Sequence, residues 1–158
     1  MKRSQGEVYQ LVSFEIAEEE FGIDILKVQE IIRFMEMTRM PNTPDFLEGV
    51  INLRGQIVPV VDLRKRFNLP GKEKDKDSRI VVVELSNKTV GFLVDSVQEV
   101  IRVETSVIDP PPELVTTIHT HYITGVAKLE DRLLILLDLD AVLSKNEQKE
   151  LQVEPVSA

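Results

Sequence analysis

The chain has 158 residues, 42% of them apolar, a length and composition that allow one ordinary domain with a hydrophobic core. It contains no cysteine, which excludes disulfides, thiolate metal ligands and cysteine nucleophiles. The formal net charge is −8 and the basic residues are scattered among acids, so nucleic acid is not expected as a partner, because its binding depends on clustered basic residues.

The N-terminal stretch MKRSQGEVYQ starts with basic residues, but no apolar segment follows them as in a secretion signal. No window approaches the roughly 18 consecutive apolar residues of a membrane span. We therefore expect a cytoplasmic protein without direct membrane insertion.

The first predicted element is a hairpin. Residues 8–16, VYQLVSFEI, alternate loosely between apolar and polar, and residues 21–25 follow a short acidic turn as the return strand. Residues 26–32, LKVQEII, fit a helical turn and a strand equally well. A loop punctuated by Pro41 and Pro44 comes next.

Residues 49–63, GVINLRGQIVPVVDL, predict a second hairpin followed by a helix. Two apolar runs flank a polar turn at Arg54 and Gly55, where glycine supplies the positive φ of a short hairpin. Asp62 is of the residue type that caps helix N-termini, and a short helix is expected after it.

Residues 71–78, GKEKDKDS, contain no apolar side chain and predict an exposed linker. The order of elements then repeats. The segment VQEVI at 97–101 matches VQEII at 28–32, and GVAKLEDRLLILLDL at 125–139 matches GVINLRGQIVPVVDL. We infer an internal duplication within a single domain, with copies at about 8–70 and 79–144 and a flexible C-terminal tail at about 151–158.

Two copies of about five short strands, each ending in a helix, predict a mainly β fold of two small barrels. A unit of about 65 residues buries little core alone, so the copies are expected to pack against each other. The equivalent segments 28–31 and 97–100 then face the seam between them. An apolar cleft at this seam suits a partner helix.

The sequence shows no nucleotide-binding, esterase or metalloprotease motif, and no catalytic residue is predicted. His119 and His121 would point the same way on a strand, but no third ligand stands near them, so we predict no metal site. Asp62 and Asp138 are better explained as helix caps than as paired catalytic carboxylates.

Arg54 has Glu130 as its counterpart in the second copy, so the shared fold does not explain it. An interface anchor and a solvated hairpin tip are equally good interpretations.

The sequence resembles the CheW family of chemotaxis coupling proteins over nearly its whole length, from about Val8 to Leu143. The segments that carry the resemblance are FGIDILKVQEI, NTPDFLEGVINLRGQIVPVVDLRKRF, VGFLVDSV and YITGVAKLEDRLLILLDLDAVL. The related CheA kinase would add hundreds of residues and the CheV type a receiver domain, so a stand-alone CheW-like chain is expected.

The resemblance implies two intertwined five-stranded SH3-like barrels and a non-enzymatic adaptor without cofactors. Such an adaptor couples the signalling tips of methyl-accepting chemoreceptors to the regulatory domain of the histidine kinase CheA, in arrays at the inner face of the membrane. The residues that it implies for the receptor-binding groove are Val28, Glu30, Ile31, Arg54, Ile80 and Val100, with Gly49 and Gly55 shaping the hairpin.

Two alternatives remain open. The same scaffold can serve another chemosensory pathway, or a barrel can bind a small molecule such as a nucleotide. The sequence does not assign the residues of a CheA interface.

Overall fold

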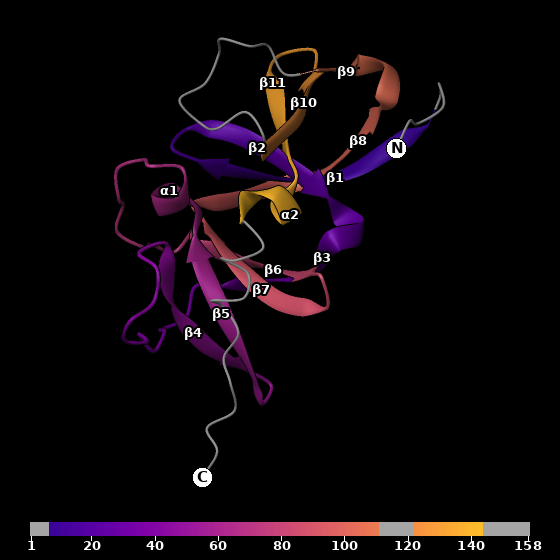
Figure 1. Ribbon diagram of the computed structural model, residues 1–158. Coiled ribbons are helices and arrows are strands. Elements are labelled where there is room, and N and C mark those ends of the chain that lie inside the picture. Colours follow the sequence, from indigo (N-terminus) through magenta and orange to yellow (C-terminus); the bar gives the residue numbers. More distant parts are fainter. Residues whose placement is uncertain (1–6, 111–121, 144–158) are drawn as a thin grey trace.

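A computed structural model describes residues 7–110 and 122–143 of the chain (Figure 1). The first half of the chain forms five strands: β1 (Val8–Ile16), β2 (Glu19–Asp24), β3 (Val28–Arg33), β4 (Leu47–Leu53) and β5 (Gln56–Asp62). The second half forms six: β6 (Arg79–Leu85), β7 (Lys88–Val94), β8 (Ser96–Glu104), β9 (Ile108–Asp109), β10 (Ile123–Lys128) and β11 (Leu133–Leu137). The helical elements are short: η1 (Ile25–Lys27), α1 (Leu63–Arg66), η2 (Thr105–Val107) and α2 (Leu139–Val142).

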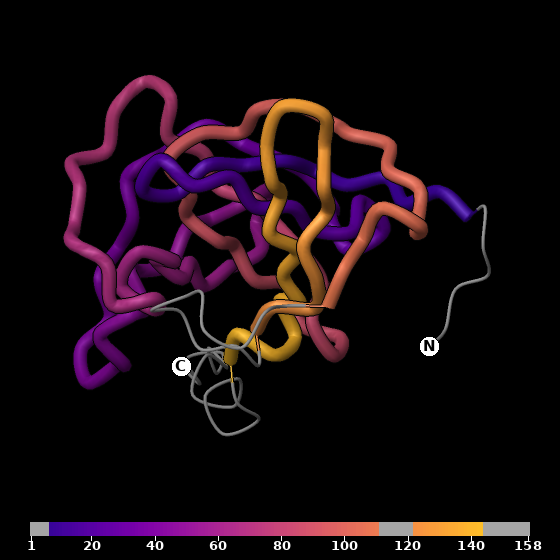
Figure 2. The backbone as a smooth tube through the Cα atoms, turned by 90° about the horizontal axis from the view of Figure 1, so that it is seen from above, coloured from indigo at the N-terminus to yellow at the C-terminus, as the bar shows by residue number. Residues whose placement is uncertain are grey.

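The two halves of the chain exchange strands. One sheet has the order β8-β1-β2-β11-β10-β9 and the other the order β3-β6-β7-β5-β4. The first two strands of each half therefore join the sheet that holds the last strands of the other half. Figure 2 shows this for the β10–β11 hairpin, which lies beside the N-terminal strands. The mainly β, intertwined fold is confirmed, and the sequence copies 8–70 and 79–144 do not coincide with the two sheets.

A parallel pair of strands marks the exchange in each sheet. Strand β11 pairs in parallel with β2, placing Leu136 opposite Gly22, and β5 pairs in parallel with β7, placing Val60 opposite Gly91. These positions are equivalent in the sequence repeat. The duplication is thus visible as a matching register in both sheets.

Each sheet is closed by the chain that follows its edge strand. In the six-stranded sheet, β8 continues through η2 into the short strand β9, which pairs with β10. In the five-stranded sheet, Thr38 forms an isolated bridge to Val50 of β4. The six-stranded sheet has one strand more than the other because β9 counts separately. Strand β9 is the end of the segment that begins with β8, and its pairing with β10 closes that barrel.

Buried apolar residues form three clusters. The largest lies between the barrels and contains side chains from both halves, including Phe14, Phe21, Phe67, Phe92 and Leu137. A smaller cluster belongs to each barrel alone, one around Ile80 and the other around Leu134. The shared cluster is what two small units gain by packing together. The buried clusters inside the barrels lend no support to a nucleotide-binding barrel.

The predicted helix caps are confirmed at both repeats. Asp62 accepts a hydrogen bond from the Arg64 amide at 2.9 Å, and Asp138 accepts one from the Asp140 amide at 3.0 Å. The segment that sequence patterns left ambiguous divides into η1 and β3, and Asp24 caps η1 through the Leu26 amide at 2.9 Å.

Neither α1 nor α2 nor any other helix of the described residues is long and apolar enough to cross a membrane. His119, His121 and the predicted tail at 151–158 lie outside the described residues.

Candidate protein-binding surface

The predicted binding residues lie mainly on two edge strands. Strand β3 forms one edge of the five-stranded sheet, and β8 forms one edge of the six-stranded sheet. They carry the repeated VQE segments. Val28 and Val97, which open these segments, both pack against the cluster shared by the barrels. The repeat thus places an equivalent strand beside the seam in each half.

Each edge strand exposes an apolar side chain three positions after this valine. Ile31 is 38% exposed and Val100, its equivalent in the repeat, is 53% exposed. An edge strand has unpaired backbone groups, and exposed apolar side chains on it favour contact with another protein. Ile31 and Val100 are therefore exposed at strand edges, whereas Val28 is partly buried against the shared cluster.

Ile80 does not lie at the surface. Its side chain is 0% exposed and packs in the cluster inside the five-stranded barrel. It stands directly opposite Ile32 in the register of β3 and β6. Ile80 supports the edge strand from within, and its predicted position in a groove is wrong. The apolar run of β6 hid this, because a strand buried on both faces shows no alternation.

Glu30 and Arg54 contact each other. Arg54 donates from Nη1 to Oε1 of Glu30 at 3.1 Å and from Nη2 to Oε2. Glu30 lies on β3 and Arg54 at the tip of the β4–β5 hairpin, so the pair joins the two edges of the five-stranded sheet. A guanidinium and a carboxylate bonded through both nitrogens hold a fixed relative orientation.

The tight turn of the hairpin explains the position of Arg54. Arg54 and Gly55 have φ angles of 52° and 85°, as the central residues of a primed hairpin turn require. The amide of Gly55 donates to Oδ1 of Asn52 at 2.8 Å. The prediction for Gly55 is confirmed, and the left-handed conformation also extends to Arg54.

Gly49 acts through close packing and not through the turn. A Cβ atom at this position would lie 2.8 Å from the carbonyl oxygen of Thr38 and 2.9 Å from Cβ of Met37. Glycine is needed here because the segment that closes the barrel crosses β4 at this point.

The Arg54 hydrogen bond lowers the pKa of the Glu30 carboxyl below its usual value, and the same contact raises the pKa of the Arg54 guanidinium. Both side chains are therefore charged at neutral pH. A partner that approaches this surface meets a paired acid and base, with the arginine side chain 70% exposed.

The second half contains a matching ion pair that the sequence alignment missed. Arg132, at the tip of the β10–β11 hairpin, donates to Glu99 of β8 at 3.1 Å. Glu99 is the repeat equivalent of Glu30. Arg132 also binds Glu20 at 2.6 Å. The interpretation of Arg54 as unique to one copy is wrong, because the second hairpin supplies its arginine from a position two residues later.

Two exposed apolar residues extend these surfaces. Ile57 and Leu133 are both exposed, and each follows the hairpin turn that carries the arginine. They are equivalent in the repeat. Both residues belong to apolar runs in the sequence, and their matched place near the start of the return strand is the signal that could have distinguished them.

A further ion pair is structural. Arg64 of α1 binds Asp95 through Nε at 2.8 Å and Nη2 at 2.5 Å, and Asp95 also accepts from the Ala17 amide at 2.9 Å. Partial burial would raise the pKa of Asp95, but these hydrogen bonds outweigh it and lower the pKa. The pair ties the helix of the first repeat to the β1–β2 turn.

Across residues 7–110 and 122–143, no three His, Cys, Asp or Glu side chains are grouped so as to hold a metal ion. The site offers strand edges, exposed apolar side chains and paired charges. These features, on two intertwined SH3-like barrels, define a protein-binding scaffold.

Comparison with known proteins gives the same class. A family model described as the CheW-like domain matches residues 10–147. The chain is 45% identical over 134 residues to the chemotaxis protein CheW of Klebsiella aerogenes, covering 85% of this chain and 81% of that protein. It is 37% identical over 140 residues to that of Helicobacter pylori, covering 89% and 84%.

The crystal structure of the scaffolding protein TtCheW from Thermoanaerobacter tengcongensis superimposes with a TM-score of 0.82 at 43% identity, covering 89% of this chain and 96% of that one. The chain belongs to the CheW family of chemotaxis proteins. The family consists of scaffolds and adaptors, so the prediction that this protein is not an enzyme is confirmed.

Proposed function

We propose that this protein couples transmembrane chemoreceptors to the histidine kinase CheA. The observation that carries the proposal is the pair of exposed apolar residues Ile31 and Val100 on equivalent edge strands. The signalling tip of a receptor is expected to be a helical hairpin, and an apolar helix face buries well against such a surface.

The Glu30–Arg54 pair gives this contact its direction. Val28 and Ile31 supply apolar area on the same strand, while the ion pair lies at the hairpin tip beside them. Charged groups at the margin of an interface contribute to orientation and partner choice more than to affinity. Ile80 holds β3 in place from inside the barrel.

We further propose a cytoplasmic location with recruitment to receptor arrays at the inner face of the membrane. Small signalling interfaces are individually weak, and an array raises their effective affinity because neighbouring contacts act together. The regulatory domain of CheA is the second partner of the proposal.

A binding experiment with two separate partners tests the proposal. The full chain is titrated with the CheA regulatory domain and with a receptor signalling-tip fragment from the same genome, using calorimetry. We expect both to bind, and Val28→Asp to weaken receptor binding while it spares the kinase contact. Failure of both partners to bind at tens of micromolar, roughly the weak end of transient complexes, contradicts the proposal. Binding only to partners from a different chemosensory system reassigns the pathway.

A further inference from the structure

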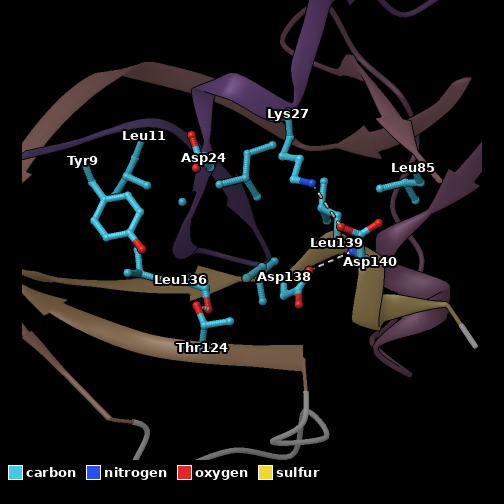
Figure 3. Close-up of a pocket in the computed structure, with 13 residues that line it drawn as sticks. Tyr9, Leu11, Asp24, Lys27, Leu85, Thr124, Leu136, Asp138, Leu139 and Asp140 are labelled. Atoms are coloured by element: carbon cyan, nitrogen blue, oxygen red, sulfur yellow. Dashed lines mark hydrogen bonds and ion pairs between the residues drawn. The ribbon is translucent and has the colours of Figure 1, made fainter. Parts of the chain in front are cut away.

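A cavity of about 190 Å³ lies between strands β1, β2 and β11 and the helices η1 and α2. Its apolar lining comes from five side chains: Leu11, Ile23, Leu85, Leu136 and Leu139. Figure 3 shows Leu11 toward one end of the open space and Leu85 and Leu139 toward the other. An apolar cavity of about 150 Å³ holds a benzene molecule, so this one has room for a branched aliphatic side chain.

The carboxyl groups around the cavity are bonded to other groups of the chain. Asp24 caps η1 and Asp138 caps α2, each through a backbone amide. Asp140 forms an ion pair with Lys27 at 3.4 Å, which joins the two helices. These charges serve the fold itself, so the surface that the cavity offers to an occupant is its apolar lining.

Leu26 extends this apolar surface out of the cavity. It lies on η1 between the lining residues Asp24 and Lys27, and 87% of it is exposed. Covering such a side chain is favourable, because its apolar area is removed from water.

The equivalent place in the other half of the repeat holds almost no empty space. Both hollows are lined by residues at equivalent repeat positions: Asp62, Arg64 and Leu93 in one, and Asp138, Asp140 and Asp24 in the other. The hollow at Asp62 has a volume of only about 10 Å³. The chain that follows α1 lines it through residues 72–74 and so takes up the space.

The segment that covers the smaller hollow is tied to its surroundings by charged groups. Arg64 of α1 donates from Nη1 to the carbonyl oxygen of Pro70 at 2.7 Å, and its Nε donates to Asp95 at 2.8 Å. Asp95 stands directly before β8, and its repeat equivalent directly before β3 is Lys27's neighbour Leu26 together with the rest of η1. An apolar residue therefore replaces a charged one at the corresponding place beside the larger cavity.

The chain that follows α2 has a composition that suits this apolar place. Residues 144–158 continue beyond Leu143 as SKNEQKELQVEPVSA. Residues 148–150 correspond to residues 72–74 by the same shift of 76 positions that relates Asp62 to Asp138. Leu151 comes directly after them and is the first apolar residue of the segment. A leucine thus stands in the sequence where an occupant of the leucine-lined cavity is needed.

We propose that the segment 144–158 folds back over α2, and that Leu151 enters the cavity and contacts Leu26. The occupant is the chain's own segment, as it is after α1 in the first half. The predicted flexible tail then begins after Leu151. Docking holds η1 against α2, and because η1 leads directly into β3, it also fixes the start of that edge strand. The proposal does not depend on the proposed receptor contact.

A double-mutant cycle in the full chain tests the contact between the two leucines. Leu26→Ala and Leu151→Ala are each expected to raise the equilibrium constant of unfolding by roughly fivefold to tenfold, because each removes the same apolar contact. The double variant should be about as stable as the less stable single variant, since residues that share one contact are not additive. Urea titration measures the three constants.

Leu133→Ala is the matched control for an exposed leucine. Leu133 is 61% exposed on β11, and its substitution should change the unfolding constant by no more than about twofold.

NMR of the ¹⁵N-labelled full chain locates the docked segment. Leu151→Ala is expected to shift the amides of Gly22, Ile23 and Leu136, whereas Val156→Ala, further along the same segment, should leave them unchanged. A mixed sample then distinguishes docking within one chain from docking between copies. Because the chain has no cysteine, Gln152→Cys accepts a single nitroxide label. Unlabelled-nitrogen protein that carries the nitroxide should not broaden the cavity amides of added ¹⁵N parent protein.

Three results overturn the proposal outright: a Leu26→Ala effect as small as that of Leu133→Ala, additive effects of the two leucine variants, or unchanged cavity amides in Leu151→Ala. Broadening of the cavity amides in the mixed sample overturns it as well, and assigns the cavity to the segment of a second copy of this chain.

Discussion

Arg54 and Glu30, 24 positions apart in the chain, are bonded through both terminal nitrogens of the guanidinium to both oxygens of the carboxylate. The contact links the tip of the β4–β5 hairpin to the edge strand β3. Arg132 and Glu99 make the corresponding link in the other barrel. The ion pair therefore belongs to the duplicated architecture.

Arg54→Asp is expected to weaken binding of a receptor tip by roughly tenfold, the effect of losing a strong interface residue. The side chain is exposed and takes no part in a buried cluster, so the thermal unfolding midpoint is expected to stay unchanged. Calorimetric binding and a thermal melt measure the two quantities. Arg132→Asp is the matched control in the second hairpin.

The double variant Glu30→Arg with Arg54→Glu separates two roles of the pair. If the pair acts by holding the hairpin against β3, the exchange restores binding. If Arg54 contacts the receptor directly, binding stays weak. Full receptor binding by Arg54→Asp itself would contradict the assigned surface.

Ile80→Ala and Val100→Asp are expected to act on different properties. Removing the buried Ile80 side chain leaves a cavity and lowers the free energy of unfolding by about 3 kcal/mol. Val100 is exposed on β8, so its substitution weakens receptor binding with little change in stability. Urea titration measures the first effect. A stable Ile80→Ala protein would mean that the barrel interior collapses onto the missing side chain.

The Arg64–Asp95 pair is expected to make stability depend on acid pH. The pKa of Asp95 is lowered in the folded state, so its stabilising effect is complete above the unfolded pKa of about 3.9 and is lost as pH falls through the lower folded value. Arg64→Ala is expected to lower the free energy of unfolding by about 2 kcal/mol at neutral pH. The loss is no larger because the pair is only partly shielded from solvent.

Urea titrations between about pH 2 and pH 7, roughly the range in which carboxyl groups titrate, measure this change in the free energy of unfolding. Asp95→Asn should show a smaller loss of stability at the acid end than the parent chain. An identical acid profile in both proteins would assign the acid sensitivity to other carboxyl groups.

Asp62 is expected to behave in the opposite way. Burial raises the pKa of Asp62 in the folded state, although Lys74 and the Arg64 amide oppose this shift. The charged carboxylate therefore lowers the free energy of unfolding, and this loss grows as pH rises through the raised folded pKa. Asp62→Asn keeps the cap acceptor and should be at least as stable as the parent at neutral pH. Asp62→Ala loses the cap, at about 1 kcal/mol. Thermal melts of the two variants distinguish cap from charge.

Gly49→Ala is expected to destabilise the protein by about 2 kcal/mol, because the new methyl group overlaps the Thr38 carbonyl. Gly71→Ala is the matched control, since nothing lies within 4 Å of a Cβ built there. Its stability should remain within about 0.5 kcal/mol of the parent. Equal effects of the two substitutions would contradict close packing at Gly49.

Local signals in the sequence were enough to predict the turn at Gly55 and the caps at Asp62 and Asp138. These features depend on residues that are adjacent in the chain. The repeated VQE segment likewise predicted two equivalent segments that face a seam, and both valines pack there.

The ion pairs were not predictable in this way. Glu30 and Arg54 meet only because the hairpin folds across the sheet, and Arg132 occupies a different repeat position from Arg54. Ile80 was placed in the groove by the family resemblance, and the apolar run of β6 could not correct this, because it does not reveal which of its side chains point inward. The exchange of strands between the halves was predicted only from the family resemblance, since the repeat itself is equally compatible with two separate units.

The exchange of strands has a consequence for synthesis on the ribosome. Strands β1 and β2 are made first, but β2 pairs in parallel with β11, the last strand among the residues that the structure describes. The N-terminal hairpin must therefore wait with one open edge until almost the whole chain has emerged. Neither half closes its own barrel, so a chain released early leaves unpaired strands that are prone to aggregate.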